Sequence, residues 1–145
     1  MSVLIKLKHI QMSKWEKKVH VKSSLPAKDT QWSLFIGRWQ PLHLGHKELF
    51  RQVINEGGKV CVAIREGEVN EKNPFTPNEV MINIANEMQF EIETGKLKVI
   101  IIPDICSVDF GRGVGYDIVE HIPPQDIHDI SATKIREQMK AEGKL

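Results

Sequence analysis

Residues 32–58 read WSLFIGRWQPLHLGHKELFRQVINEGG, and this stretch decides the fold. It opens with a short apolar run that ends at Gly37 and predicts a buried strand. We expect a helix from about Leu44 to Glu56, because apolar residues recur along one side and Gly57-Gly58 follows its end. A strand that leads directly into a helix is typical of a parallel α/β sheet.

The chain repeats this alternation towards its C-terminus. Lys59–Ile64 is almost continuously apolar, which favours a strand covered on both faces of a sheet. Thr76, Pro77 and Glu79 have the N-cap, first-position proline and capping-box pattern of a helix start. The remaining predicted elements are a third strand at Leu97–Ile102, a fourth at Tyr116–His121 and a final helix at Ser131–Ala141. We therefore predict an α/β domain with a short parallel sheet over residues 31–145.

Residues 1–30 differ from the rest in pattern and charge. Val3–Lys8 and Lys18–Lys22 predict two strands, and Ser23–Thr30 predicts a linker, so we expect a hairpin-like N-terminal β extension. Seven lysines and two acidic residues give this segment a net charge of +5, against −4 for residues 31–145. A basic segment can bind nucleic acid or an acidic partner, but the alternation favours a solvated strand pair. Nucleic acid is therefore not the expected partner, and an exposed strand edge also allows a homo-oligomer.

The composition excludes several classes of protein. Of the 145 residues, 41% are hydrophobic and 27% are charged, which is an ordinary globular balance. Cys61 and Cys106 are too few for a disulfide scaffold. The sequence contains no stretch of membrane-spanning length and does not open like a signal peptide. We expect a soluble cytoplasmic protein.

The segment from Gly37 to His46 is the first candidate site. It follows a strand end, where ligands bind in open α/β sheets, and it leads into a helix N-terminus, which favours phosphate. His43 and His46 are three residues apart and can face one ligand, and Gly45 lets the ligand approach the backbone. Arg38 adds a positive charge. Two histidines alone are too few ligands for a metal site.

The second candidate site is ISATKIR, residues 130–136. Ser131 is a plausible N-cap for the last helix. Lys134 and Arg136 place positive charge near a helix N-terminus, where each opposes the helix dipole by roughly 0.3–1 kcal/mol. A bound anion would turn this conflict into complementarity. The alternative is an ordinary solvent-exposed helix start.

Together, the two segments resemble the HxGH and ISxTxxR motifs of the nucleotidylyltransferase superfamily. The resemblance covers residues 32–141 and implies a Rossmann-like nucleotidylyltransferase fold. Three pieces are similar to the archaeal-type nicotinamide mononucleotide adenylyltransferases: Gly37–Pro41, Asn73–Thr76 and Ile102–Ile105.

This resemblance implies transfer of AMP from ATP to a phosphorylated small molecule, with nicotinamide mononucleotide as a candidate acceptor and Mg²⁺ carried by the phosphates. His43, His46 and Arg136 are the implied catalytic residues. Residues implied in nucleotide or phosphate binding are Gly37, Arg38, Gly45, Ser131, Thr133 and Lys134. Candidates for binding the acceptor are Trp39, Gln40 and Asp104.

The sequence departs from that family between the third strand and the last. The family has a longer segment there, with an aromatic residue that packs on nicotinamide. Only Pro103–Gly115 fills this place, and it contains no tryptophan, so we expect a shortened sheet. Two alternatives stay open. One is a cytidylyltransferase that uses CTP, and the other is a nucleotide-binding regulatory protein with little catalytic activity.

Overall fold

The computed structural model describes residues 15–112 and 115–145, and these residues form two compact units. The first unit combines the N-terminal segment up to Ala27 with Phe110–Asp129. The second combines Lys28–Asp109 with Ile130–Leu145. The predicted strand at Val3–Lys8 lies outside the described residues.

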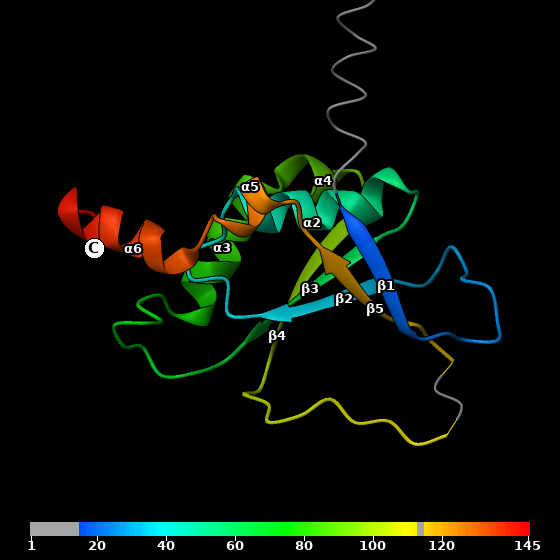
Figure 1. The fold of residues 1–145 in the computed structure, drawn as a ribbon. Coiled ribbons are helices and arrows are strands. Elements are labelled where there is room, and N and C mark those ends of the chain that lie inside the picture. The colour runs from blue at the N-terminus through cyan, green and yellow to red at the C-terminus, as the bar shows by residue number, and fades with distance from the viewer. Residues whose placement is uncertain (1–14, 113–114) are drawn as a thin grey trace, which may run out of the picture. The chain divides into compact units, whose positions relative to one another are not determined.

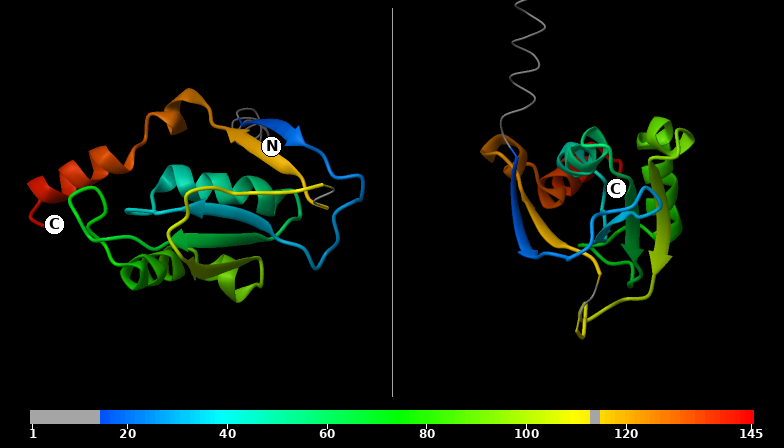
Figure 2. Two further views of the ribbon diagram at one scale, coloured as in Figure 1. Left: turned by 90° about the horizontal axis from the view of Figure 1, so that it is seen from below. Right: turned by 90° about the vertical axis from the view of Figure 1, so that its right-hand side faces the viewer.

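The second unit contains a parallel sheet in the order β2-β3-β4 (Figures 1 and 2). Its strands are β2 (Ser33–Gly37), β3 (Val60–Arg65) and β4 (Leu97–Ile102). All three match predicted strands, so the short parallel sheet is confirmed. The central strand β3 is buried over its first five residues, which explains its continuous apolar sequence.

The helices of this unit also follow the predicted pattern. They are α2 (Leu44–Asn55), α3 (Pro77–Glu87), α4 (Gln89–Glu93) and α6 (Ala132–Ala141). At the start of α3, the Thr76 hydroxyl accepts from the Glu79 N–H, and the Glu79 carboxylate accepts from the Thr76 N–H. The predicted capping box is therefore confirmed. The sequence did not predict α4, a single short turn without a side-chain cap.

One face of β3 meets both crossover helices. Val60, Val62 and Ile64 alternate along β3 and share a buried cluster with Phe50 of α2 and Ile84 of α3. None of these five side chains exceeds 1% exposure. Successive crossovers to neighbouring parallel strands are right-handed, which places α2 and α3 on the same face.

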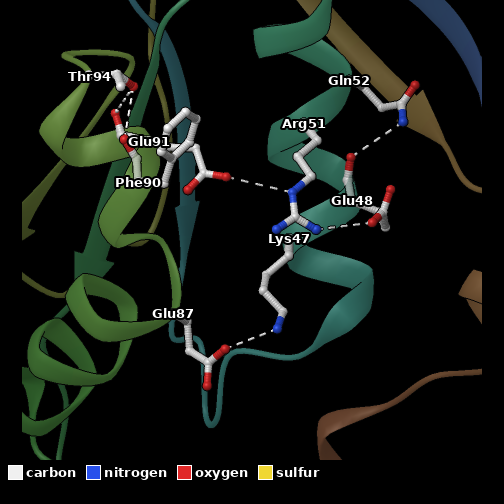
Figure 3. Close-up of polar contacts among 8 residues, drawn as sticks. All are labelled: Lys47, Glu48, Arg51, Gln52, Glu87, Phe90, Glu91 and Thr94. Atoms are coloured by element: carbon white, nitrogen blue, oxygen red, sulfur yellow. Dashed lines mark hydrogen bonds and ion pairs between the residues drawn. The ribbon is translucent and has the colours of Figure 1, made fainter.

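Ion pairs join these helices at their surface (Figure 3). Lys47 of α2 lies 3.0 Å from Glu87 at the end of α3. Arg51 of α2 lies 3.2 Å from Glu48 and 3.7 Å from Glu91 of α4. Ion pairs that keep partial contact with solvent contribute about 1 kcal/mol or less each, so the shared apolar face provides most of the stability of this packing.

The first unit contains the antiparallel pair β1 (Glu16–Val21) and β5 (Ile118–Ile122), which lie side by side in Figure 2. The short helix α5 (Gln125–His128) follows β5 and was not predicted. The predicted strand at Lys18–Lys22 is confirmed, but the partner that the structure gives it is β5. The expectation that the fourth strand would pair in parallel is wrong. A parallel crossover usually needs a helix, and the residues described between β4 and β5 form none.

Across residues 15–112 and 115–145, no helix has both the length and the apolar character that crossing a membrane requires.

Candidate functional site

His43 and His46 form a reciprocal pair at the N-terminus of α2. His43 is the N-cap, and its Nδ1 accepts from the His46 N–H at 3.3 Å. The His46 Nδ1 accepts from the His43 N–H at 3.2 Å. The rings stack with centroids 3.6 Å apart and planes 17° apart. The predicted convergence of the two side chains is therefore present in the structure.

This geometry determines which ring nitrogen of each histidine can meet a ligand. Burial lowers the pKa of His43, and burial together with the charge of His43 lowers the pKa of His46 to about 3. Both rings are therefore neutral near pH 7. Because each Nδ1 accepts a hydrogen bond, we infer that each proton lies on Nε2. The pair thus offers two N–H donors of fixed orientation.

The Trp39 side chain packs against the ring of His46. Its backbone has a φ of 54°, and its side chain is 7% exposed. The indole Nε1 donates to the Ala63 carbonyl at 3.1 Å, and the ring meets that of His46 edge-on at 4.8 Å. Gly37 makes room for this ring, because a Cβ at that position would lie 2.8 Å from the indole. These contacts give Trp39 a structural role, and its predicted role in binding the acceptor stays a prediction.

Gln40 connects the first motif to the loop before α3. Its Nε2 donates to the Phe75 carbonyl at 2.9 Å, and its Oε1 accepts from the Phe75 N–H at 3.0 Å. The residue is only 8% exposed. The two bonds hold the loop that carries Asn73–Thr76 against the first motif. The predicted contact of Gln40 with the acceptor likewise stays a prediction.

The second motif reaches the first through Arg136. The Ser131 hydroxyl caps α6 by accepting from the Lys134 N–H at 3.1 Å, as predicted. Arg136 donates through Nη1 to the Gln40 carbonyl at 2.7 Å and through Nη2 to the Thr133 hydroxyl at 3.3 Å. The fold therefore joins residues 37–46 to residues 130–136. Gly45 is buried in the first turn of α2, whereas the Lys134 side chain is exposed.

Arg38, Arg65 and Asp104 meet at the carboxyl ends of the three parallel strands. The Asp104 Oδ1 accepts from the Arg38 Nη2 at 3.1 Å and from the Arg65 Nη2 at 2.9 Å. Desolvation opposes ionisation of Asp104, but hydrogen bonds and charges from Arg65 and Arg38 outweigh it and hold the carboxyl pKa below its usual value. The sequence reasoning missed Arg65. Its position directly after the apolar run of β3 was the signal that could have found it.

Metal-binding side chains are not grouped in this site. Among the described residues, no three His, Cys, Asp or Glu side chains lie where they could hold a metal ion together.

Comparisons with known proteins agree with this geometry. Residues 34–84, which include the histidine pair, match a family model described as cytidylyltransferase-like. No solved structure gives a significant match. The chain is 36% identical to a nicotinamide-nucleotide adenylyltransferase of Thermococcus sibiricus. The match covers 50% of this chain and 40% of the Thermococcus sibiricus protein.

Two further relatives carry the same name. The Methanococcus aeolicus protein is 28% identical over 77% of this chain and 63% of its own length. The Thermococcus kodakarensis protein is 32% identical over 65% of this chain and 50% of its own length. The chain thus spans between 40% and 63% of the length of these three relatives.

The Rossmann-like sheet, the two motifs and these matches all support a relationship to the nucleotidylyltransferase superfamily, whose family model the chain resembles over residues 34–84. Within that superfamily, its similarity is to the archaeal nicotinamide-nucleotide adenylyltransferases.

Proposed function

We propose that this chain transfers AMP from ATP to a phosphorylated small molecule, with nicotinamide mononucleotide as the first candidate. An oxygen of the acceptor phosphate attacks the α-phosphorus of ATP and forms a new P–O bond. The bond between that phosphorus and the oxygen bridging to the β-phosphate breaks, and pyrophosphate leaves with both electrons of the broken bond. No covalent intermediate with the protein is needed.

The observation that carries this proposal is the reciprocal histidine pair at the start of α2. Both Nδ1 atoms are engaged with backbone N–H groups, so His43 and His46 are held rigidly with Nε2–H available to a ligand. Donors fixed in advance, at a partly buried helix N-terminus, stabilise charge as it develops on a leaving group. We assign to them the bridging oxygen and the β-phosphate.

Arg136 contributes the second contact with the leaving group. In this role, its guanidinium exchanges its bond with the Thr133 hydroxyl for one with a phosphate oxygen and keeps its bond with the Gln40 carbonyl. Ser131 and Thr133 contribute backbone N–H groups at the N-terminus of α6. The Lys134 side chain, which is exposed to solvent, contributes a positive charge. Mg²⁺ would be held mainly by phosphate oxygens and water, which requires no dedicated cage of protein ligands.

Two nucleotides are candidates for the donor. The names of the relatives support ATP with nicotinamide mononucleotide as acceptor. The family model that matches residues 34–84 is described as cytidylyltransferase-like and supports CTP as the second candidate.

The test is an assay of pyrophosphate release with each nucleotide, with and without nicotinamide mononucleotide. We expect pyrophosphate and nicotinamide adenine dinucleotide in equal amounts from ATP, and at least tenfold less product from CTP. Faster release from CTP with another phosphorylated acceptor would identify a cytidylyltransferase. Nucleotide binding without pyrophosphate release with any phosphorylated acceptor would contradict the proposal and favour the regulatory alternative.

A further inference from the structure

We infer that Arg65 and Arg38 together bind the acceptor phosphate and that Asp104 is the positioning residue that holds them side by side. The inference rests on the proposed function, to which it adds the way the second substrate is bound. Arg65 comes from β3, Arg38 follows β2 and Asp104 follows β4, so all three stand at the carboxyl edge of the sheet.

The two guanidinium groups share one oxygen atom. Arg38 and Arg65 each use Nη2 to reach the Asp104 Oδ1, at 3.1 and 2.9 Å. Two cations close together repel each other, and the single carboxylate offsets that repulsion while it leaves the group with a net charge of +1. The shared carboxylate oxygen therefore helps to hold the two arginine side chains next to each other.

Backbone contacts hold each arginine in this position. Arg38 donates from Nη1 to the Glu66 carbonyl at 3.2 Å, and Arg65 donates from Nη2 to the Ile105 carbonyl at 2.9 Å. Gly67 leaves room for this arrangement, since a Cβ there would overlap the Arg38 Nη1 atom and the guanidinium would have to shift. Within residues 15–112 and 115–145, both side-chain hydrogen bonds of Arg65 leave from Nη2, and its Nε is buried without a partner, so Nη1 is the nitrogen left for a ligand.

The chemistry of the reaction decides which anion the pair receives. The acceptor phosphate and ATP are both anionic and must meet at one phosphorus atom, so the acceptor needs a cation of its own. His43, His46 and Arg136 are assigned to the departing pyrophosphate at the N-termini of α2 and α6. Arg65 and Asp104 lie outside both motifs, and the group that they form with Arg38 matches a phosphate monoester, which accepts hydrogen bonds from two guanidinium groups.

The experiment compares Arg65→Gln with Arg51→Gln, a matched variant on α2 whose ion pairs with Glu48 and Glu91 lie outside the motifs (Figure 3). We expect Arg65→Gln to raise the KM for nicotinamide mononucleotide about tenfold or more, the size of a lost charge-assisted bond. The KM for ATP should stay within about twofold of the wild-type value. Arg51→Gln should change neither constant by more than that. A rise in the KM for ATP alone would assign the pair to the triphosphate and overturn the inference.

Asp104 is tested by Asp104→Ala and Asp104→Asn. If the carboxylate positions the arginines, Asp104→Ala raises the KM for nicotinamide mononucleotide, and Asp104→Asn, which keeps an acceptor oxygen, raises it less. A lower KM in Asp104→Ala would show that the carboxylate competes with the substrate, which would overturn its positioning role.

A binding measurement separates this inference from the proposed function. Inorganic phosphate is titrated into the full chain, and the rise in thermal midpoint is measured for wild type, Arg65→Gln and Arg51→Gln. A smaller rise in Arg65→Gln alone supports the pair even if the wild type transfers nothing to nicotinamide mononucleotide. Equal rises in the thermal midpoint of all three proteins overturn the inference. The proposed function is then decided by the assay of pyrophosphate release alone.

Discussion

The imidazole rings of His43 and His46 lie stacked at 3.6 Å, and each accepts the backbone N–H of the other residue through Nδ1. Each histidine is therefore both a cap of α2 and a proposed donor to phosphate. A substitution at either position removes the two roles at once unless the new side chain can replace the Nδ1 contact.

The first prediction separates these roles at position 46. His46→Asn places an amide oxygen near the position of Nδ1, so it should keep the bond from the His43 N–H but lose the Nε2 donor. We expect His46→Ala to lower kcat by at least about 100-fold and to lower the unfolding free energy by about 1 kcal/mol. His46→Asn should lose as much kcat with a smaller loss of stability. Near-normal turnover in either folded variant would remove His46 from the catalytic role.

The second prediction concerns pH. The unfolded chain takes up a proton at His46 near pH 6.5, whereas the folded protein does so only at about pH 3. The unfolding free energy should therefore fall as pH drops through this window, by up to about 1.4 kcal/mol per pH unit from this residue. The unfolding free energy, measured by urea denaturation at pH 7, 6 and 5, should change less with pH in His46→Asn than in the wild type. The same pH dependence of the unfolding free energy in both proteins would show that His46 titrates normally in the folded protein.

The third prediction concerns the close approach of Gly37 and Trp39. An alanine Cβ at position 37 would lie 2.8 Å from the Cε2 and Cζ2 atoms of the indole. The ring must then shift, at a cost of about 1–3 kcal/mol, and its contact with His46 would weaken. We expect Gly37→Ala to lower both the thermal midpoint and kcat. Gly111→Ala, whose Cβ finds no atom within 4 Å among the described residues, should change neither.

Elements with a local signal were predictable from the sequence. Continuous apolar runs marked β3 and β4. The capping box, a four-residue motif from Thr76 to Glu79, marked the start of α3. The N-cap of α2 was harder to predict. Histidine is not among the residues that usually cap helices, so the sequence suggested that His43 and His46 converge but not that they cap the helix.

Contacts between distant residues were not predictable in the same way. The pairing of β1 with β5 brings together distant residues such as His20 and Glu120, which are 100 positions apart along the chain. The bond between Arg136 and the Gln40 carbonyl spans 96 positions. Strand alternation says which face a residue occupies, but it does not say which strand lies beside it. The contact of Arg65 with Asp104 was missed for the same reason, because the two residues are 39 positions apart.

The last prediction concerns Arg136, for which the structure changes the expected stability. From the sequence alone, Arg136 only opposes the dipole of α6, so its removal should cost little. The bond to the Gln40 carbonyl at 2.7 Å adds about 1.5–3 kcal/mol for a charged donor, and the dipole subtracts about 0.3–1 kcal/mol. We therefore expect Arg136→Ala to lower the unfolding free energy of the ligand-free protein by about 1 kcal/mol or slightly more.

Ligand binding then tests the phosphate role of the same residue. ATP with Mg²⁺ should raise the thermal midpoint of the wild type, since a ligand that binds only the folded state stabilises it. AMP should raise it much less, because it lacks the phosphates assigned to Arg136. The rise caused by ATP, measured from each protein's own ligand-free midpoint, should be mostly lost in Arg136→Ala and partly kept in Arg136→Lys, which retains the charge but not the planar fork. An undiminished rise in Arg136→Ala would reduce the residue to a structural link between α6 and the Gln40 carbonyl, and the triphosphate would then depend on the histidine pair alone.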